Sequence, residues 1–272
     1  MIELFISVSL FALGAALGSF AAASVWRLRA QQLTTDALHG EKAEKVDSDE
    51  VKKLLSQKRS VTSDRSVCLH CGRQLNWYEL IPVVSWLAVG GRCRTCKEPI
   101  GRMEILAEVL LGAAFVVSYL FWPYSFDTQG IVLFTIWLIV LVALAIHWMY
   151  CARWFLLLDK ITLVIGFSAL LFAALMLAEQ PSALLTGSLA SIGLILLVLP
   201  GFYGLLFVVS RGAWVGFGDV KLLVPFALLL PSWEYGVLLI FLANLIGSLT
   251  LLPAILSKKL SRTTRVPFGP FI

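Results

Sequence analysis

Charged residues are scarce in this sequence. Asp, Glu, Lys and Arg make up 14% of the 272 residues, whereas 59% of the residues are hydrophobic. Several apolar stretches continue for ~18 residues or more, which is long enough to cross the ~30 Å hydrocarbon layer of a membrane. A membrane β-barrel would instead show short segments of alternating polar and apolar residues. The composition therefore argues against a soluble domain and indicates an all-α protein that crosses the bilayer several times.

Seven apolar segments are candidates for transmembrane helices. They are residues 3–25, 103–122, 131–149, 155–177, 184–209, 220–231 and 236–256, of which the sixth is short. The first is expected to be retained rather than cleaved as a signal peptide, because no basic region precedes it and Arg27 and Arg29 follow it. The final residues, RVPFGPFI, turn toward another apolar segment, so an eighth helix is expected in a complete chain.

Lysine and arginine are absent from three of the connecting segments, residues 123–130, 178–183 and 232–235. Fourteen of the 22 basic residues lie in residues 27–102, and the others fall on the same side if the spans alternate. This asymmetry predicts an N-terminus outside and a cytoplasmic location for residues 27–102. The net charge of +5 is then explained by orientation beside anionic lipid and requires no nucleic-acid partner.

Four of the five cysteines form two Cys-x-x-Cys pairs, Cys68 with Cys71 and Cys93 with Cys96. Four thiolates in this pattern favour a closed, tetrahedral zinc site. Zinc binding would supply folding free energy to a segment too small for a good apolar core. The alternative is two reduced or redox-active pairs, since a cytoplasmic location argues against structural disulfides. The chain is therefore expected to have three parts: a first helix, 1–26, a zinc-binding cytoplasmic domain, 27–102, and a membrane core, 103–272.

A second motif, GFGDVKLL, runs from Gly216 to Leu223. It places Asp219 at the start of a short helix at the membrane face. Gly216 and Gly218 are expected to let the backbone turn tightly and to let another part of the chain approach closely. A carboxylate at such a boundary suits acid–base catalysis. The alternative is an aspartate that caps the helix by accepting hydrogen bonds from backbone N–H groups.

With these motifs in this order, the chain resembles the type IV prepilin peptidases, a family of intramembrane aspartic proteases with a Gly-x-Gly-Asp motif. The likeness covers nearly the whole chain and includes GALGSFAAASVWRL, ELIPVVSWLAVGGRCRTCKEPIGRMEILAEVL, WFLLLDKITL, GFGDVKLL and VPFGPF. The resemblance implies an enzyme of the bacterial inner membrane. It would remove the basic leader from type IV prepilins or type II secretion pseudopilins, after a glycine, at the cytoplasmic face. Many bacterial members then N-methylate the new N-terminus with S-adenosylmethionine.

The resemblance also implies two catalytic aspartates, and only one is found at its expected place. The second maps onto Asp219. The first should precede a Leu-Pro-Asp-like sequence by about eight residues; here that sequence ends at Asp159, with Leu158 in the usual proline position. Counting back eight residues reaches Cys151, so a cysteine occupies the place of the first aspartate. We expect proteolysis to be disabled, because a lone carboxylate has no partner with which to share the proton.

The residues around Cys151 are also compatible with two other roles. Asp159 could replace the missing aspartate, although it lies eight residues away and is expected to cap the next helix or to contact Lys160. Cys151 could act as a nucleophile with His147, which lies on the same helical face four residues earlier. No residue in the sequence obviously orients His147, so an inert thiol beside a packed histidine is favoured.

Glutamates near the membrane edge are the other candidate site residues. Glu104 and Glu108 lie four residues apart at the start of the second span and share a helical face. With Glu79 and Glu98 they could attract a basic leader. By the resemblance, Glu104 and Glu108 belong to a region linked with methyl transfer. The alternative is solvated glutamates at a helix N-terminus. No glycine-rich Rossmann loop is visible, so a site for S-adenosylmethionine would be unconventional.

Two rival functions follow from the same residues. A relative that binds pilin-like segments without cutting them, as an assembly factor, would tolerate Cys151. A transporter is disfavoured, because the spans carry few ionisable groups and no repeat of broken helices is found. The expected partners are therefore prepilins or pseudopilins and membrane lipid.

Overall fold

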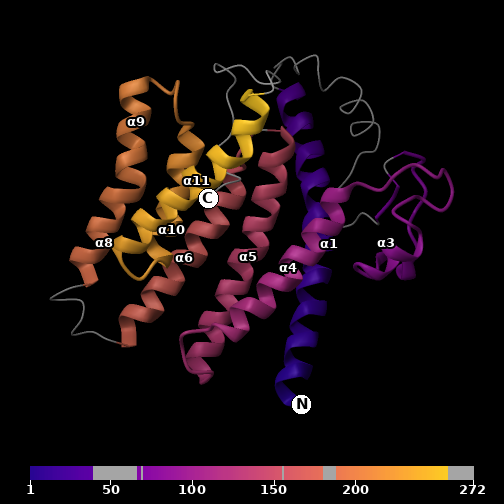
Figure 1. Cartoon of the computed structure of the whole chain (residues 1–272), viewed down its shortest axis with the longest axis horizontal. Helices are drawn as coiled ribbons and strands as arrows, with labels where there is room; N and C mark the ends of the chain where they lie inside the picture. Colours follow the sequence, from indigo (N-terminus) through magenta and orange to yellow (C-terminus); the bar gives the residue numbers. More distant parts are fainter. Residues whose placement is uncertain (39–65, 69, 155, 180–187, 257–272) are drawn as a thin grey trace. The chain divides into compact units, whose positions relative to one another are not determined.

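The computed structural model describes residues 1–38, 66–68, 70–154, 156–179 and 188–256 (Figure 1). Within these residues the regular structure is helical, and the only β pairing is two isolated bridges. The predicted all-α fold is therefore confirmed. The chain divides into two compact units, Met1–Pro123 and Tyr124–Ile272. The sequence analysis divided the chain into three parts by their expected position relative to the membrane, whereas these two units are defined by packing. The three-part division stays a prediction.

Six helices in the described part of the chain are long and apolar enough to cross a membrane: Ile2–Thr35, Arg102–Leu120, Thr128–Trp154, Asp159–Ala178, Ser191–Ser210 and Trp233–Thr250. Each corresponds to one of the seven expected spans. The seventh, residues 220–231, falls in α10 (Phe217–Leu229), which has 13 residues. A helix of that length rises ~20 Å. It is therefore too short to cross the hydrocarbon layer unaided, and its place as a span stays a prediction.

The first unit is built on two helices, α1 (Ile2–Leu38) and α4 (Arg102–Leu120), that pack side by side (Figure 1). Glycines bring the two backbones close together. A Cβ at Gly18 would lie 2.6 Å from the carbonyl oxygen of Ala107, and one at Gly14 would lie 2.8 Å from that of Leu111. Glycines spaced four apart on one helix are a known means of close helix packing in membranes. Larger residues at these positions would separate α1 from α4.

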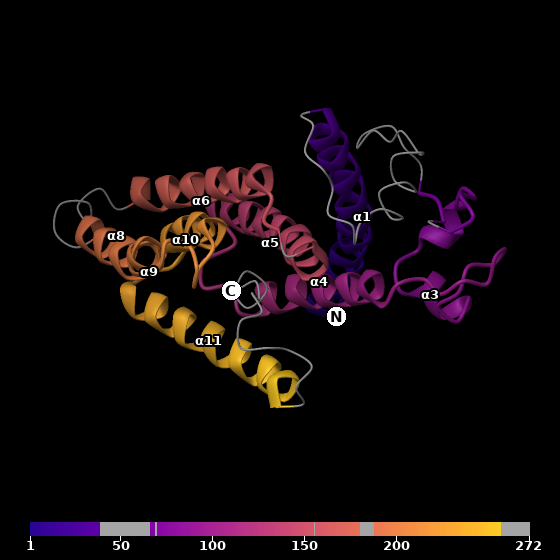
Figure 2. The same ribbon diagram turned by 90° about the horizontal axis from the view of Figure 1, so that it is seen from above.

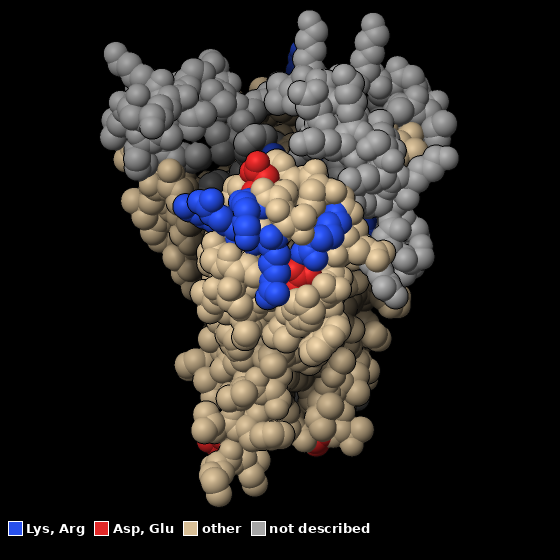
Figure 3. Space-filling model, turned by 90° about the vertical axis from the view of Figure 1, so that its right-hand side faces the viewer, with Lys and Arg blue, Asp and Glu red and all other residues tan. Residues whose placement is uncertain are grey.

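The segment that carries the four paired cysteines connects α1 to α4 along the chain. Its helical parts are short: η2 (Trp77–Leu80) and α3 (Val84–Ala88). Figure 3 shows basic side chains gathered over part of one face of the molecule, with uncharged surface beside them. The segment contributes Arg73, Arg92, Arg94 and Lys97 to the basic residues of this unit. Its polarity contrasts with the apolar helices that flank it.

The second unit surrounds the short helix α10 with longer ones. The elements are α5 (Thr128–Trp154), α6 (Asp159–Glu179), α8 (Ser188–Leu196), a π-helical turn η3 (Leu197–Gly201), α9 (Phe202–Ser210), α10 and α11 (Trp233–Leu256). Helix α10 packs against α6, α8, η3 and α9, while α5 packs against α6 (Figure 2). The short helix that carries the GFGD motif therefore lies at the centre of its unit.

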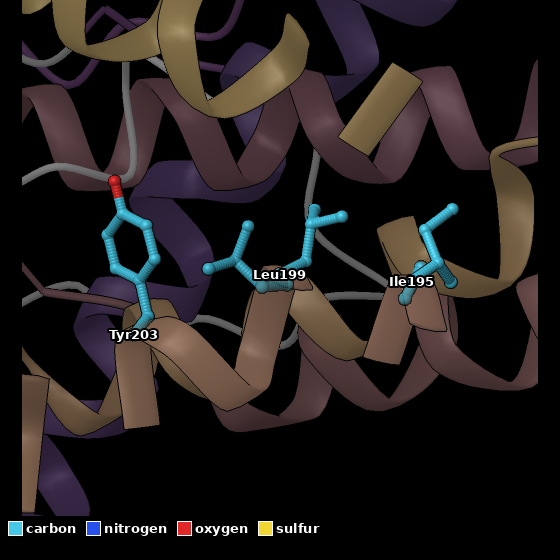
Figure 4. Close-up of a cluster of buried hydrophobic side chains, with 5 residues drawn as sticks. Ile195, Leu199 and Tyr203 are labelled. Carbon is cyan, nitrogen blue, oxygen red and sulfur yellow. The ribbon is translucent and has the colours of Figure 1, made fainter. Parts of the chain in front are cut away.

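Apolar side chains fix α10 against the continuous helix formed by α8, η3 and α9. The buried cluster consists of Ile195, Leu199, Tyr203, Leu223 and Ala227 (Figure 4). Pro200 lies inside the π-helical turn. A proline removes one backbone donor, and π-helical turns are a common local response to a disrupted helix that often occurs near functional sites. The π-helical turn ends two residues before Tyr203.

Candidate functional site

Two turns of matching geometry carry the paired cysteines. The backbone N–H groups of Cys68 and Cys93 each donate a hydrogen bond to the carbonyl five residues ahead, at 2.9 Å in both turns. The residue after the second cysteine of each pair adopts a positive φ, 71° at Gly72 and 60° at Lys97. A left-handed residue at this point folds each Cys-x-x-Cys pair back on itself. Both turns therefore present two sulfur atoms in the same direction.

The four sulfur atoms form one cluster. All four Sγ atoms lie within 4.8 Å of one another, and those of Cys68 and Cys96 are 3.8 Å apart. Tetrahedral zinc with Zn–S bonds of ~2.3 Å separates its sulfur ligands by ~3.8 Å. The structure thus brings together the cysteines that the sequence paired, at a spacing compatible with zinc.

The thiols of Cys93 and Cys96 differ in how readily they lose their protons. Hydrogen bonds from the backbone N–H groups of Cys96 and Thr95 lower the pKa of the Cys93 thiol to about 6. The backbone at Glu98 favours the Cys96 thiolate, but burial and the neighbouring thiols together raise the pKa of Cys96 to about 12. Four thiolates must form when a metal binds, so protons would be released and metal affinity would rise with pH.

An ion-pair clamp that the sequence analysis missed joins the two turns. Arg73, two residues after the first cysteine pair, donates hydrogen bonds to both carboxylate oxygens of Glu79, at 2.7 and 3.0 Å. Arg94, within the second pair, lies 3.7 Å from the same carboxylate. The hydrogen bonds from Arg73 hold the pKa of Glu79 below its usual value. Glu79 is therefore engaged within the segment rather than available as an unpaired charge.

Glu108 connects helix α4 to the cysteine-bearing segment. Its carboxylate is buried and accepts a hydrogen bond from the backbone N–H of Val83 at 2.7 Å. Ser19 of α1 also hydrogen-bonds to it. Val83 has φ 61° and ψ −52°, which is costly for a β-branched residue. The solvated-glutamate alternative is therefore wrong for Glu108, which ties three parts of unit 1 together.

Glu104 lies one turn before Glu108 on the same face. The indole N–H of Trp26 donates to its carboxylate at 3.4 Å. One carboxylate oxygen of Glu104 is buried. The structure therefore places both glutamates at the packed junction of α1 and α4, and an aromatic ring accompanies one of them.

Asp219 lies in the first turn of α10 and is only 6% exposed. The residue at the N-cap position is Gly216, so Asp219 is not itself the N-cap residue of α10. A Cβ at Gly218 would lie 2.7 Å from Cδ1 of Leu157, in the connection before α6. The expected close approach thus occurs at Gly218. Gly216 has φ −76° and ψ 144°, which other residues adopt readily, so no special turn is needed there.

Cys151 lies in the last turn of α5 and is fully buried. The charge of Asp219 acts on its thiol, so the two residues that the family resemblance paired occupy one neighbourhood of unit 2. His147, one turn earlier, is 3% exposed, and neither ring nitrogen has a hydrogen-bond partner among the described residues. Within the part of the chain that the structure describes, no third group orients the imidazole toward the thiol, as a cysteine protease would need.

Asp159 has a partner that the sequence analysis did not identify. Both of its carboxylate oxygens lie 3.0 Å from Nζ of Lys221, two residues after Asp219. Its side chain is 70% exposed. The pair links the start of α6 to α10. Asp159 therefore contacts Lys221 rather than the expected Lys160.

The sequence analysis also missed a hydrogen bond between α11 and α9. The side-chain amide of Asn244 on α11 donates to the hydroxyl oxygen of Tyr203 on α9, at 2.9 Å. The charge of Asp219 also acts on this hydroxyl. Tyr203 lies in the proline-interrupted stretch LPGFYG of the fifth expected span, and Asn244 is an isolated polar residue in an apolar span, but neither signal predicts that the two residues meet.

The comparisons with known proteins point to one family. The sequence profile described as the Bacterial Peptidase A24 N-terminal domain matches residues 12–122. The type 4 prepilin-like proteins leader peptide-processing enzyme of Escherichia coli O78:H11 is 29% identical, across 94% of this chain and 87% of that protein. No solved structure matches the chain.

Two further relatives share one name, prepilin leader peptidase/N-methyltransferase. The protein of Aeromonas hydrophila is 29% identical, across 76% of this chain and 68% of its own length. That of Burkholderia pseudomallei strain 1026b is 30% identical, across 76% of this chain and 64% of its own length. The matched regions thus include most of this chain.

Proposed function

We propose, on the premise that this chain belongs to the type IV prepilin peptidase family, that it is a prepilin leader peptidase/N-methyltransferase whose peptidase step is disabled by Cys151. Its substrates are type IV prepilins or type II secretion pseudopilins. The enzyme lies in the bacterial inner membrane, with its N-terminus outside. Residues 27–102 and the Asp219 site face the cytoplasm, where a basic leader would be located.

The observation that carries this proposal is that Cys151 and Asp219 are both buried in unit 2 and interact electrostatically. Peptide hydrolysis by two carboxylates requires one to accept a proton from water and the other to donate one. Asp219 supplies a single carboxylate, and the buried group near it is a thiol. A thiol is a weak hydrogen-bond donor and, when protonated, a poor base. Loss of one member of such a pair typically costs several orders of magnitude in rate.

The four-cysteine cluster is assigned a structural zinc ion. Four sulfur ligands would complete the coordination of such an ion and would leave no position for water or substrate. The ion would hold the two cysteine turns together, with the Glu79 clamp beside them. Zinc therefore has no part in hydrolysis in this proposal.

Methyl transfer is assigned to the junction of α1 and α4. A carboxylate beside an aromatic ring suits a cation, and Glu104 with Trp26 offers that combination. Both the sulfonium of S-adenosylmethionine and the N-terminal ammonium of a cleaved pilin are cations. S-adenosylmethionine supplies the methyl group when it is bound. Glu104 and Glu108 would hold the amine and accept the proton that it must lose before it can act as a nucleophile.

The test is prepilin cleavage in proteoliposomes by four forms of the chain. The Cys151→Asp variant should cut, whereas the chain itself and a Cys151→Ser variant of similar size should not. Adding Asp219→Asn to Cys151→Asp should abolish cutting again. If the unmodified chain cuts as fast as Cys151→Asp, the pairing of Cys151 with Asp219 is wrong. If no form cuts although the zinc cluster is loaded, the assignment of a peptidase fails.

The presence of Cys151 where the family has an aspartate also favours one alternative function. That alternative is a pilin-binding assembly factor with no enzymatic step. The two functions differ in methyl transfer. The unmodified chain should transfer labelled methyl groups from S-adenosylmethionine to a pilin whose leader has already been removed. Binding of the pilin without any transfer, at a concentration of S-adenosylmethionine that saturates an active relative, would favour the assembly factor.

A further inference from the structure

The short helix α3, in the segment that carries the four cysteines, has an outer face made only of apolar side chains. Val84, Leu87 and Ala88 are three and four residues apart and therefore share one side of the helix. All three are exposed, Val84 by 60% and Leu87 by 63%. Trp86, on the opposite side, covers Gly91, where a Cβ would lie 2.6 Å from its ring. Helix α3 thus packs its aromatic side chain against the segment and leaves an apolar face uncovered.

The residues before α3 enlarge this exposed apolar surface. In η2 and the connection that follows it, Trp77 is 78% exposed, Leu80 42% and Ile81 40%. Single exposed apolar residues are common on proteins in water, but several together mark a surface that meets a partner or a membrane. The surface formed by η2 and the outer face of α3 is therefore expected to be covered.

Glu108 shows how far along helix α4 this surface lies. The N–H of Val83, immediately before α3, donates to the Glu108 carboxylate at 2.7 Å. Helix α4 begins at Arg102 and has 19 residues, so it is ~28 Å long and only just spans a hydrocarbon layer of ~30 Å. Its first residue then lies at the edge of that layer. Glu108 lies ~9 Å further along the helix, which places the start of α3 at the depth of the membrane.

Contacts with α1 agree with this depth. Ser19 of α1 hydrogen-bonds to the same Glu108 carboxylate, and a Cβ at Gly18 would lie 2.7 Å from the Cα of Glu108. The turn before α3 therefore meets both long helices of unit 1 at one level. Figure 1 shows α3 beside the middle of α1 rather than beyond its end. The segment thus folds back along the membrane helices instead of projecting away from them.

Basic side chains lie between α3 and the first turn of α4 along the chain. Arg92, Lys97 and Arg102 are all exposed. An apolar surface accompanied by lysine and arginine is typical of elements that lie at a membrane interface, with apolar groups among the acyl chains and cations at the headgroups. Cations near the surface are attracted by anionic lipids. This charge pattern favours lipid over an apolar protein helix as the partner of the α3 face.

We infer that η2 and α3 lie in the interface of the bilayer, with Val84 and Leu87 against acyl chains and the neighbouring basic residues against anionic phospholipid headgroups. This inference goes beyond the proposed function and depends on neither enzymatic step. It changes the picture of residues 27–102 as a domain surrounded by water. The four-cysteine cluster is held at the membrane surface by the segment that it stabilises.

A fluorescent amino acid at Leu87, in proteoliposomes of phosphatidylethanolamine and phosphatidylglycerol, tests the contact with acyl chains. Lipids brominated on their acyl chains should quench this probe, and one at Val84, several-fold more strongly than a probe at Gln74, an exposed residue of the first cysteine turn. Iodide in the water should show the opposite order. Resistance of residues 66–101 to trypsin shows that each variant keeps the segment folded.

Two results of this experiment would overturn the inference. Strong quenching at Leu87 and Val84 by iodide would show that α3 lies in water. Protection of both probes from both quenchers would show that protein, such as a second copy of the chain, covers the face.

The part played by anionic headgroups is tested by placing the bromine on one lipid at a time. The Leu87 probe should be quenched more strongly when phosphatidylglycerol carries the bromine than when the same amount of phosphatidylethanolamine does. Arg92→Gln combined with Arg102→Gln should remove this difference, while total quenching by lipid stays high. Equal quenching by the two lipids without these substitutions would overturn the assignment of anionic lipid. Neither experiment uses cleavage or methyl transfer, so the inference can fail while the proposed function stands, and the reverse.

Discussion

At the scale of single residues, the site in unit 2 is defined by which polar groups are buried and which are exposed. Asp219 and Cys151 are buried, and the charge of one acts on the other. Asp159 lies in the solvent-exposed ion pair with Lys221. Burial near a reacting group strengthens electrostatic interactions, whereas exposed ion pairs contribute little. These surroundings agree with the role proposed for Asp219 and make Asp159 a link between helices.

Asp159→Asn tests this division of roles. In the Cys151→Asp background it removes the ion pair with Lys221 but no buried carboxylate. Prepilin cleavage should therefore fall by no more than about fivefold, because exposed ion pairs are worth ~1 kcal/mol or less. Lys221→Gln, which breaks the same pair from the other side, should have a similar effect. Complete loss of cleavage in Asp159→Asn, but not in Lys221→Gln, would show that Asp159 takes part in the reaction.

At the scale of elements, the helices are positioned by glycines and by a helix cap. Where α1 meets α4, Gly18 and Gly14 admit the backbone of the partner helix. At the start of α5, the carboxylate of Asp127 accepts a hydrogen bond from the N–H of Gly130 at 2.8 Å. Both devices act through the backbone. They therefore depend on a narrow choice of residue at one position, and a single substitution can test each of them.

Gly18→Leu should separate α1 from α4. The new side chain would begin 2.6 Å from a carbonyl oxygen and 2.7 Å from the Cα of Glu108, and such overpacking costs ~1–3 kcal/mol or more. The expected result is a lower melting temperature in detergent and poorer protection of the cysteine-bearing segment from protease. Gly193→Leu is the control, because a Cβ at Gly193 meets no atom within 4 Å. Equal destabilisation by both substitutions would contradict the close packing at Gly18.

The cap at Asp127 predicts a pH dependence of unit 2. The hydrogen bond from Gly130 holds the pKa of Asp127 below its usual value of 3.8. A group whose pKa is lowered by folding stabilises the folded state above its unfolded pKa, and this contribution is lost as pH falls through the folded value. Asp127→Ala should therefore lower the melting temperature by a few degrees at pH 7, and the difference from the parent should vanish below the folded pKa of Asp127.

Asp127→Asn is the matched control for this pH effect. Asparagine caps helices about as well as aspartate and carries no charge. Its melting temperature should stay close to that of the parent at pH 7 and should lack the acid-dependent loss from this position. An Asp127→Ala penalty that persists unchanged at the lowest pH would show that the charged cap is not its source.

At the scale of the whole molecule, the sequence predicts composition-driven features better than pairwise contacts. The apolar runs predicted six of the long helices, and the Cys-x-x-Cys spacing predicted the sulfur cluster, because each signal is local in the chain. The partners of Glu79, Lys221 and Asn244 were missed, because each contact is decided by packing between distant segments rather than by a pattern. Glu79 was taken as a possible substrate contact, yet two arginines beside the cysteine turns surround it.

Metal removal tests whether the two units are stabilised independently of each other. The four cysteines and the Glu79 clamp all lie in unit 1. A segment stabilised by metal ligation unfolds when the metal is removed. Chelation of the purified protein should therefore make residues 66–101 sensitive to trypsin while α5 to α11 remain protected in detergent.

Cys96→Ser should reproduce this pattern without a chelator. It leaves three ligands, and its sensitivity to trypsin should not be reversed by added zinc, whereas that of the chelated parent should be. Tryptic fragments identified by mass spectrometry report which unit is cut. Cleavage throughout α5 to α11 at the same chelator concentration would mean that the metal stabilises both units, and the cluster could then no longer be assigned to the folding of unit 1 alone.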